Sequence, residues 1–162
     1  MARFPVEFSI SVPGAGALTT ALSRYADKID DFTPFWSDYF IPTWYSMMYL
    51  QYRSEGAATN APWAPLTDRY AAWKQKHYPG QPIGVLTGRA RGALTSPFHP
   101  DAFVQKGKRS FQVGTELKYP IYLQLGTRRM RARPPMRVNR FFMVTVGKLL
   151  QKFAHDVIKG RV

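Results

Sequence analysis

Apolar and polar residues alternate strictly at the start of the chain, where every second position from Phe4 to Val12 is apolar. A period of two is typical of a strand with one buried face. Because Pro5 cannot donate a backbone hydrogen bond, we expect this strand to lie at the edge of a sheet or to begin at its proline. An edge strand can also pair with a neighbouring subunit.

The pattern then changes to a helical one. Apolar residues recur every three or four positions between Leu18 and Phe32, which predicts an amphipathic helix. Thr33 followed by Pro34 is typical of a capped helix start and predicts a second helix to about Arg53, which Pro42 should kink or split. A broad aromatic face on this helix, larger than a small monomer normally exposes, is a candidate contact surface: Trp36, Tyr39, Phe40, Trp44, Met47 and Met48.

Glycine and proline divide the rest of the chain into short elements. The predicted elements are a loop over 56–62, a helix from Thr67 to about His77, a weak helix over 87–95, a hairpin with strands at 102–105 and 110–113, an apolar segment over 119–125 that fits either a strand or a helix, a basic loop over 126–135, and an amphipathic helix from Val138 to Val157 that ends before Gly160. This order predicts an α+β fold, in which a small antiparallel sheet (the N-terminal strand plus the hairpin near 102–115) packs with amphipathic helices.

The length of 162 residues fits a single domain over 1–162, from which we expect the extended basic loop 126–137 to protrude. The uncharged aromatic stretch from Tyr39 to Leu50 is shorter than the roughly 20 residues of a membrane span. No secretory signal is recognised at the start of the chain. We therefore expect a soluble protein without a membrane partner.

Positive charge is concentrated in the second half of the chain. The net charge is +13, yet residues 1–85 carry seven basic and seven acidic residues. The densest basic segment has six arginines within thirteen residues and no acid among them: Arg128, Arg129, Arg131, Arg133, Arg137 and Arg140. Arginine pairs with phosphate or carboxylate, so this segment can contact DNA or an acidic protein, or it can be a mobile basic loop that only adds solubility.

Residues for catalysis or metal binding do not form a recognisable pattern. Cysteine is absent, and His77, His99 and His155 are not spaced as metal ligands. No serine lies in a nucleophile motif, and the glycines near 14–16 and 84–88 do not complete a phosphate-binding loop. The acids at 27–38 fit a solvated helix face better than a catalytic pair. We expect no enzyme activity, no cofactor and no metal.

Three clusters of residues follow one another between positions 62 and 138. The first is Trp63-Ala64-Pro65-Leu66, followed by Tyr70 and Lys74. The second is Val85-Leu86-Thr87-Gly88, which runs to Ala93-Leu94-Thr95. The third is Val113-Gly114-Thr115, then Tyr119, Gln124-Leu125-Gly126 and Arg133-Pro134. In this order and spacing the chain resembles the bacteriophage virion morphogenesis, or tail-completion, family of the Mu type.

The resemblance implies a structural virion protein with no catalytic site. It would be a ring-forming neck or tail-completion subunit, a homo-oligomer of six or twelve copies, that joins the head connector to the tail tube or tail terminator proteins. It would be assembled in the host cytoplasm and reside in the neck or tail of the virion, with genomic DNA passing through its channel. We expect Trp63, Pro65 and Leu66 to anchor a loop to the core, and Gly88, Gly114 and Gly126 to serve backbone turns. The alternative function is a basic nucleic-acid-binding protein that uses the arginine segment.

Overall fold

The computed structural model describes residues 6–7 and 31–159. Its sheet has three antiparallel strands in the order β1-β3-β2. These strands are β1 (Val6–Glu7), β2 (Ala102–Lys106) and β3 (Phe111–Thr115). The hairpin is confirmed, and Val6–Glu7 form an edge strand as expected. The rest of the predicted N-terminal strand and nearly all of the predicted helix over 18–32 lie outside the described residues.

Helices account for most of the remaining structure, so the α+β fold is confirmed. In chain order they are α2 (Thr33–Phe35), the π-helical segment η1 (Trp36–Phe40), α3 (Ile41–Arg53), the short 3-10 helix η2 (Ala57–Thr59), α4 (Asp68–His77), α5 (Arg89–Thr95), α6 (Pro120–Leu125) and α7 (Arg140–Ile158). The ambiguous segment before Gly126 is therefore helical. Among residues 31–159, no helix is long and apolar enough to cross a membrane.

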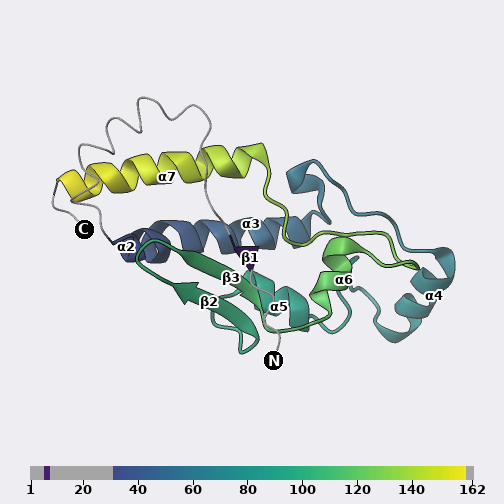
Figure 1. Cartoon of the computed structure of the whole chain (residues 1–162). Coiled ribbons are helices and arrows are strands. Elements are labelled where there is room, and N and C mark those ends of the chain that lie inside the picture. Colours follow the sequence, from purple (N-terminus) through teal and green to yellow (C-terminus); the bar gives the residue numbers. More distant parts are fainter. Residues whose placement is uncertain (1–5, 8–30, 160–162) are drawn as a thin grey trace.

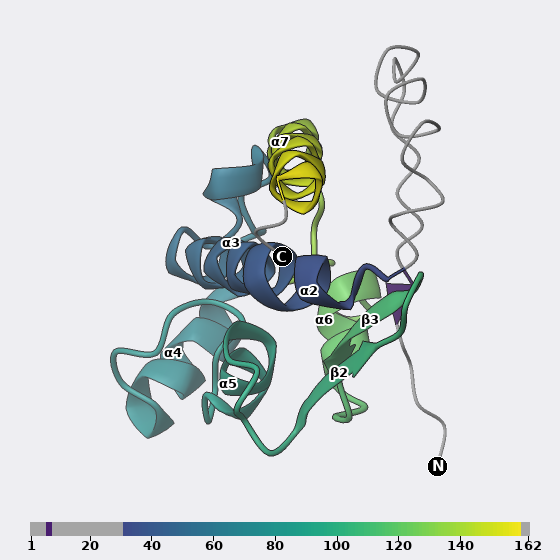
Figure 2. The same cartoon turned by 90° about the vertical axis from the view of Figure 1, so that its left-hand side faces the viewer.

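Helix α3 occupies the centre of the molecule. Figure 1 shows α7 running antiparallel along one side of α3, with α5 and the sheet on the other side. The view along α3 shows the same arrangement, with α4 and α5 on the side opposite α7 (Figure 2). Because α3 is covered on both sides, its apolar residues need not be confined to one narrow stripe.

Pro42 is accommodated without interrupting the helical path. The preceding segment, Trp36–Phe40, is π-helical, and the Ile41 N–H donates to the carbonyl of Trp36, five residues earlier. Proline lacks an N–H and its ring collides with the preceding helical turn, so a wider turn at this point relieves the conflict. The kink or split predicted at Pro42 therefore takes the form of a π-helical turn.

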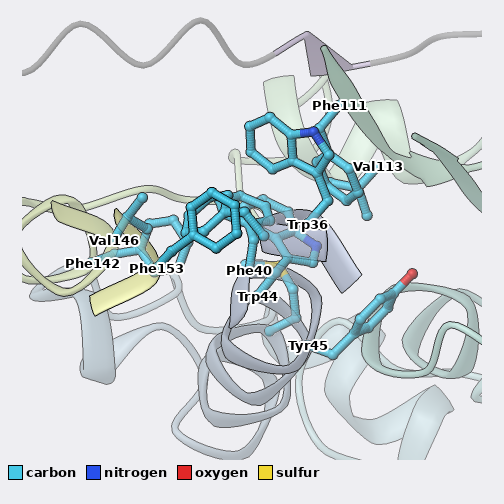
Figure 3. Close-up of a cluster of buried hydrophobic side chains, with 11 residues drawn as sticks. Trp36, Phe40, Trp44, Tyr45, Phe111, Val113, Phe142, Val146 and Phe153 are labelled. Atoms are coloured by element: carbon cyan, nitrogen blue, oxygen red, sulfur yellow. The ribbon is translucent and has the colours of Figure 1, made fainter. Parts of the chain in front are cut away.

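The aromatic residues of η1 and α3 form the main core instead of an exposed face (Figure 3). Phe40 and Trp44 are each 1% exposed, and both rings contact Phe142 of α7 edge-on at centroid distances of 6.0 and 5.8 Å. Trp36 stacks on Phe111 of β3 at 5.4 Å. The predicted contact surface on this helix is thus wrong, because α7 and β3 cover it.

Helix starts agree with the sequence to within a few residues, but the capping groups differ. Asn139 accepts a hydrogen bond from the Phe142 N–H at 2.8 Å and caps α7. Thr67 precedes α4 as predicted, yet its side chain makes no capping hydrogen bond. Thr33 is already inside its helix, and its N–H donates to the carboxylate of Asp31 at 2.7 Å.

Candidate docking groove

Residues of all three clusters line one surface groove. The groove has a volume of about 770 Å³. Nine cluster residues line it: Leu66, Tyr70, Lys74, Val85, Leu86, Thr87, Gly88, Tyr119 and Arg133. They come from the loop before α4, from α4 itself, from the segments that lead into α5 and α6, and from the chain after α6. Residues as far apart in the sequence as Leu66 and Arg133 thus build a single site, which local sequence patterns cannot reveal.

Trp63 lies beside this groove and acts as a structural residue, as predicted. It is 6% exposed and packs edge-on against Tyr52 at a centroid distance of 5.4 Å. Its ring also fills the space beside Gly84, where an added Cβ would lie 2.8 Å from the indole. Pro65 differs from Trp63, because its side chain is exposed and only its carbonyl is engaged.

Side chains from distant elements fix the segment that follows the basic turn. The carbonyl of Pro134 accepts hydrogen bonds from Gln51 Nε2 at 3.0 Å and from Trp63 Nε1 at 3.2 Å. The side-chain amide of Gln124 both donates to the carbonyl and accepts from the N–H of Met136, at 2.8 and 3.1 Å. We call residues 133–136, held in this way, the clasped segment.

Arg133 belongs to the clasped segment and is not an exposed contact residue. It is 6% exposed, and its Nε and Nη2 donate to the carbonyls of Ala64 and Pro65 at 2.6 and 2.8 Å. Burial lowers the pKa of Arg133 from its ordinary value. The predicted partner or DNA contact at Arg133 is therefore corrected: its guanidinium fastens the basic loop to the loop before α4.

Gly126 allows the chain to turn sharply out of α6. Its φ is +76°, and an added Cβ would lie 2.8 Å from the N atom of Ala132 and 2.9 Å from the O atom of Met130. The turn expected at this glycine is confirmed, as is the one at Gly88, whose φ is +81°. Gly114 was also expected in a turn, but it lies inside β3 opposite Phe103.

Only part of the predicted basic loop is exposed. Arg128, Arg129 and Arg131 are exposed on the turn over residues 127–132, which we call the arginine turn. They line a second hollow, which shares Leu66, Tyr70, Met130 and Arg133 with the groove. Figure 1 shows the chain between α6 and α7 extending beside α4 at this point.

The remaining predicted residues lie away from the groove and the second hollow. Arg137 and Arg140 are exposed near the start of α7 and line neither of them. Thr115 ends β3, and its hydroxyl donates to the carbonyl of Asp101 at 2.9 Å. The six predicted arginines therefore do not form one patch.

Cations of the groove are mostly bound to other protein groups. Lys74 is 5% exposed, and its Nζ donates to the carbonyl of Pro82 at 2.5 Å. Burial lowers the pKa of Lys74, and the negative charge of Glu55 opposes this shift. Arg89 binds Asp101 through two hydrogen bonds of 2.6 Å, which raise the pKa of the guanidinium and lower that of the carboxyl.

Arg91 and Tyr122 also line the groove, and sequence reasoning did not single them out. Arg91 is one of several scattered arginines in the sequence, and Tyr122 lies in the segment that fitted a strand or a helix. Their importance follows only from the fold, which brings α5 and α6 to the same groove. A helical prediction for 119–125 would have been the one available signal for Tyr122.

Within residues 6–7 and 31–159, no three histidine or carboxylate side chains lie together as a metal site would require. Comparison of the chain with known protein families, with curated proteins and with solved structures finds no match. The resemblance to tail-completion proteins therefore stays a prediction.

Proposed function

We propose that the chain is a structural subunit of a bacteriophage particle, which forms a ring at the neck and completes the junction between head and tail. The observation that carries this proposal is that residues of all three clusters line one groove. If these residues build the surface that binds a neighbouring subunit, their similarity to the tail-completion pattern has a physical explanation. In this proposal the protein has no catalytic step.

The arginine turn supports the same function. Three exposed arginines lie beside the groove, and no acidic residue is among the residues that line the second hollow. A neck subunit meets acidic surfaces of its neighbours and stands beside DNA in an axial channel, so an exposed basic projection suits that position. We propose a closed ring of six or twelve copies between the head connector and the tail tube or tail terminator, assembled in the host cytoplasm.

Exposed apolar side chains outside the core are consistent with self-association. Phe141 at the start of α7 is 79% exposed, and Leu125 at the end of α6 is 72% exposed. Large apolar side chains at such exposure are stabilised when a neighbouring subunit covers them. These residues replace the aromatic face of α3 as the candidate apolar contacts between copies.

Native mass spectrometry of the purified full chain tests the proposal, together with mass spectrometry of purified phage particles that encode it. We expect a closed oligomer of one size in solution and the chain among the particle proteins. A Phe141→Ser variant should weaken the oligomer, whereas Lys148→Ser, on the same helix, should not. A chain that stays monomeric at high concentration and is missing from intact particles refutes the function.

The second candidate function is nucleic-acid binding through the arginine turn, which its three exposed arginines favour. Removal of one phosphate-binding arginine should reduce the slope of log binding constant against log salt by about one unit. We therefore compare an Arg128, Arg129, Arg131 triple Ala variant with a variant that removes three exposed lysines elsewhere, Lys76, Lys118 and Lys148. Arg133 is left unchanged, because its replacement would disturb the fold. A slope that falls only in the arginine variant favours nucleic-acid binding.

A further inference from the structure

The charges that line the groove all have one sign. Among the residues that the structure describes, its lining includes Lys74, Arg89, Arg91 and Arg133, and no aspartate or glutamate. The adjoining second hollow adds the three exposed arginines of the arginine turn, again without an acid in its lining. A ligand with negative charge is therefore favoured over one with positive charge along both hollows.

Three of the four groove cations are already bound to other protein groups. Lys74 and Arg133 donate to backbone carbonyls, and Arg89 is bound to Asp101. Arg91 is exposed, and in the part of the chain that the structure describes its guanidinium has no hydrogen bond or ion pair. The groove itself thus offers one cation at its rim, and the arginine turn supplies the others.

The walls of the groove are apolar and aromatic. Val85 and Ala90 are buried at its base, whereas Tyr70 and Tyr119 are each 43% exposed and Tyr122 is 57% exposed. Exposed tyrosine rings around an apolar base can receive a large apolar side chain and still hydrogen-bond to a polar backbone. Single-stranded nucleic acid also stacks its bases on aromatic rings, but it needs free cations along its backbone, and the groove proper offers one, Arg91.

We propose that the groove and the arginine turn together bind an extended acidic segment of a partner protein, in which one large apolar side chain is flanked by aspartate or glutamate. The apolar side chain fits between Tyr70, Tyr119 and Tyr122, and the flanking carboxylates meet Arg91 on one side and the arginine turn on the other. The two hollows share four lining residues, so one peptide can follow both. This inference rests on the proposed function, since it takes the partner to be a neighbouring protein of the particle.

Nuclear magnetic resonance of the ¹⁵N-labelled full chain tests the inference. The probe is a short synthetic peptide with one central Phe flanked by runs of Asp and Glu. We expect it to shift amide signals of groove residues such as Leu86, Gly88 and Tyr122, and to leave those in the middle of α7 unchanged. Three comparison probes are the same peptide with Ala for Phe, the same peptide with Asn and Gln for the acids, and a single-stranded oligothymidine.

Matched variants locate the charge requirement. Arg91→Gln should weaken binding of the acidic peptide by about threefold to tenfold, as expected when one charge-assisted hydrogen bond is removed. Lys148→Gln removes one exposed charge from α7 and should leave the affinity unchanged. Equal affinity for the neutral peptide, or equal weakening by both variants, overturns the inference.

The remaining outcomes also decide between occupants. Tighter binding of oligothymidine at the same amides assigns the site to nucleic acid and overturns the inference, as does the absence of any binding by the acidic peptide. Groove signals that move with protein concentration alone assign the site to a second copy of the chain and overturn it too. Oligomer size is measured separately by native mass spectrometry. A chain that forms a ring but does not bind the peptide rejects only this inference. A chain that binds the peptide but never forms rings or enters particles rejects the proposed function.

Discussion

Two tyrosines of α3 have buried hydroxyl groups without a hydrogen-bond partner among the described residues. Tyr45 is 6% exposed and Tyr52 is 2% exposed. Figure 3 shows the ring of Tyr45 turned away from the other labelled aromatic side chains. A buried hydroxyl that gives up its bonds to water without a protein partner in exchange costs about 1–3 kcal/mol. Phenylalanine keeps the ring and removes this cost.

We therefore expect Tyr45→Phe and Tyr52→Phe each to raise the free energy of unfolding by about 1 kcal/mol. For a chain of this size, each kcal/mol corresponds to a rise in melting temperature of about 2–4 °C. Urea unfolding followed by circular dichroism measures the change. Tyr39→Phe is the matched control and should destabilise, because the Tyr39 hydroxyl donates to Asp156 Oδ2 at 2.8 Å.

The pH dependence of stability gives a second readout of the same hydroxyls. Burial raises the pKa of Tyr45 from 10.0 to about 12. Between pH 10.0 and about pH 12 the Tyr45 hydroxyl is ionised in the unfolded chain and protonated in the folded chain. The free energy of unfolding therefore keeps its full value below this range and falls as the pH rises through it. The fall should be smaller in Tyr45→Phe. A decrease in stability of about 1 kcal/mol in both phenylalanine variants at neutral pH refutes the reasoning, since it means that the hydroxyls are well bonded.

Three further predictions concern stability, each measured by the same urea unfolding. Asn139→Ala should cost about 1 kcal/mol by removing the cap of α7, whereas Thr67→Ala, at a start without a side-chain cap, should cost almost nothing; equal costs contradict the assignment of the caps. Gly80→Ala should lower the free energy of unfolding by about 1 kcal/mol, because Gly80 has a φ of +75° but open space around it, and Gly84→Ala should lower it by about 1–3 kcal/mol more, because the added Cβ meets the Trp63 indole. A larger loss in Gly80→Ala contradicts this packing. Arg133→Met should cost about 3 kcal/mol by leaving two carbonyls without donors, and a change below about 1 kcal/mol contradicts its buried role.

Element positions could be predicted from the sequence where a local signal decides them. The proline and glycine that follow His77 explain why α4 ends there as predicted, and the glycine between 105 and 110 explains why the predicted hairpin forms. Both signals act within a few residues, so they do not depend on the rest of the fold. The spacing of apolar residues predicted α7 for the same reason, because it is a property of the segment itself.

The exposure of individual side chains could not be predicted from the sequence, because it depends on which other elements pack against them. The aromatic residues of η1 and α3 looked too numerous for one buried stripe, yet α7 and β3 bury Phe40 and Trp44 from different directions. Arg133 looked like its neighbours, but its partner carbonyls are 68 and 69 positions away. The groove is assembled in the same way, from separate stretches that no short pattern connects.

The clasped segment makes the shape of the arginine turn depend on most of the polypeptide. Its bonds reach back 83 positions to Gln51, 71 to Trp63 and 69 to Ala64, and closing such long loops costs chain entropy. A chain translated only as far as residue 132 has none of these bonds. On a ribosome, the turn therefore gains its final form only after residues 133–136 have emerged and have reached α3 and Trp63. A product truncated at residue 132 therefore lacks the contacts that hold the arginine turn in place.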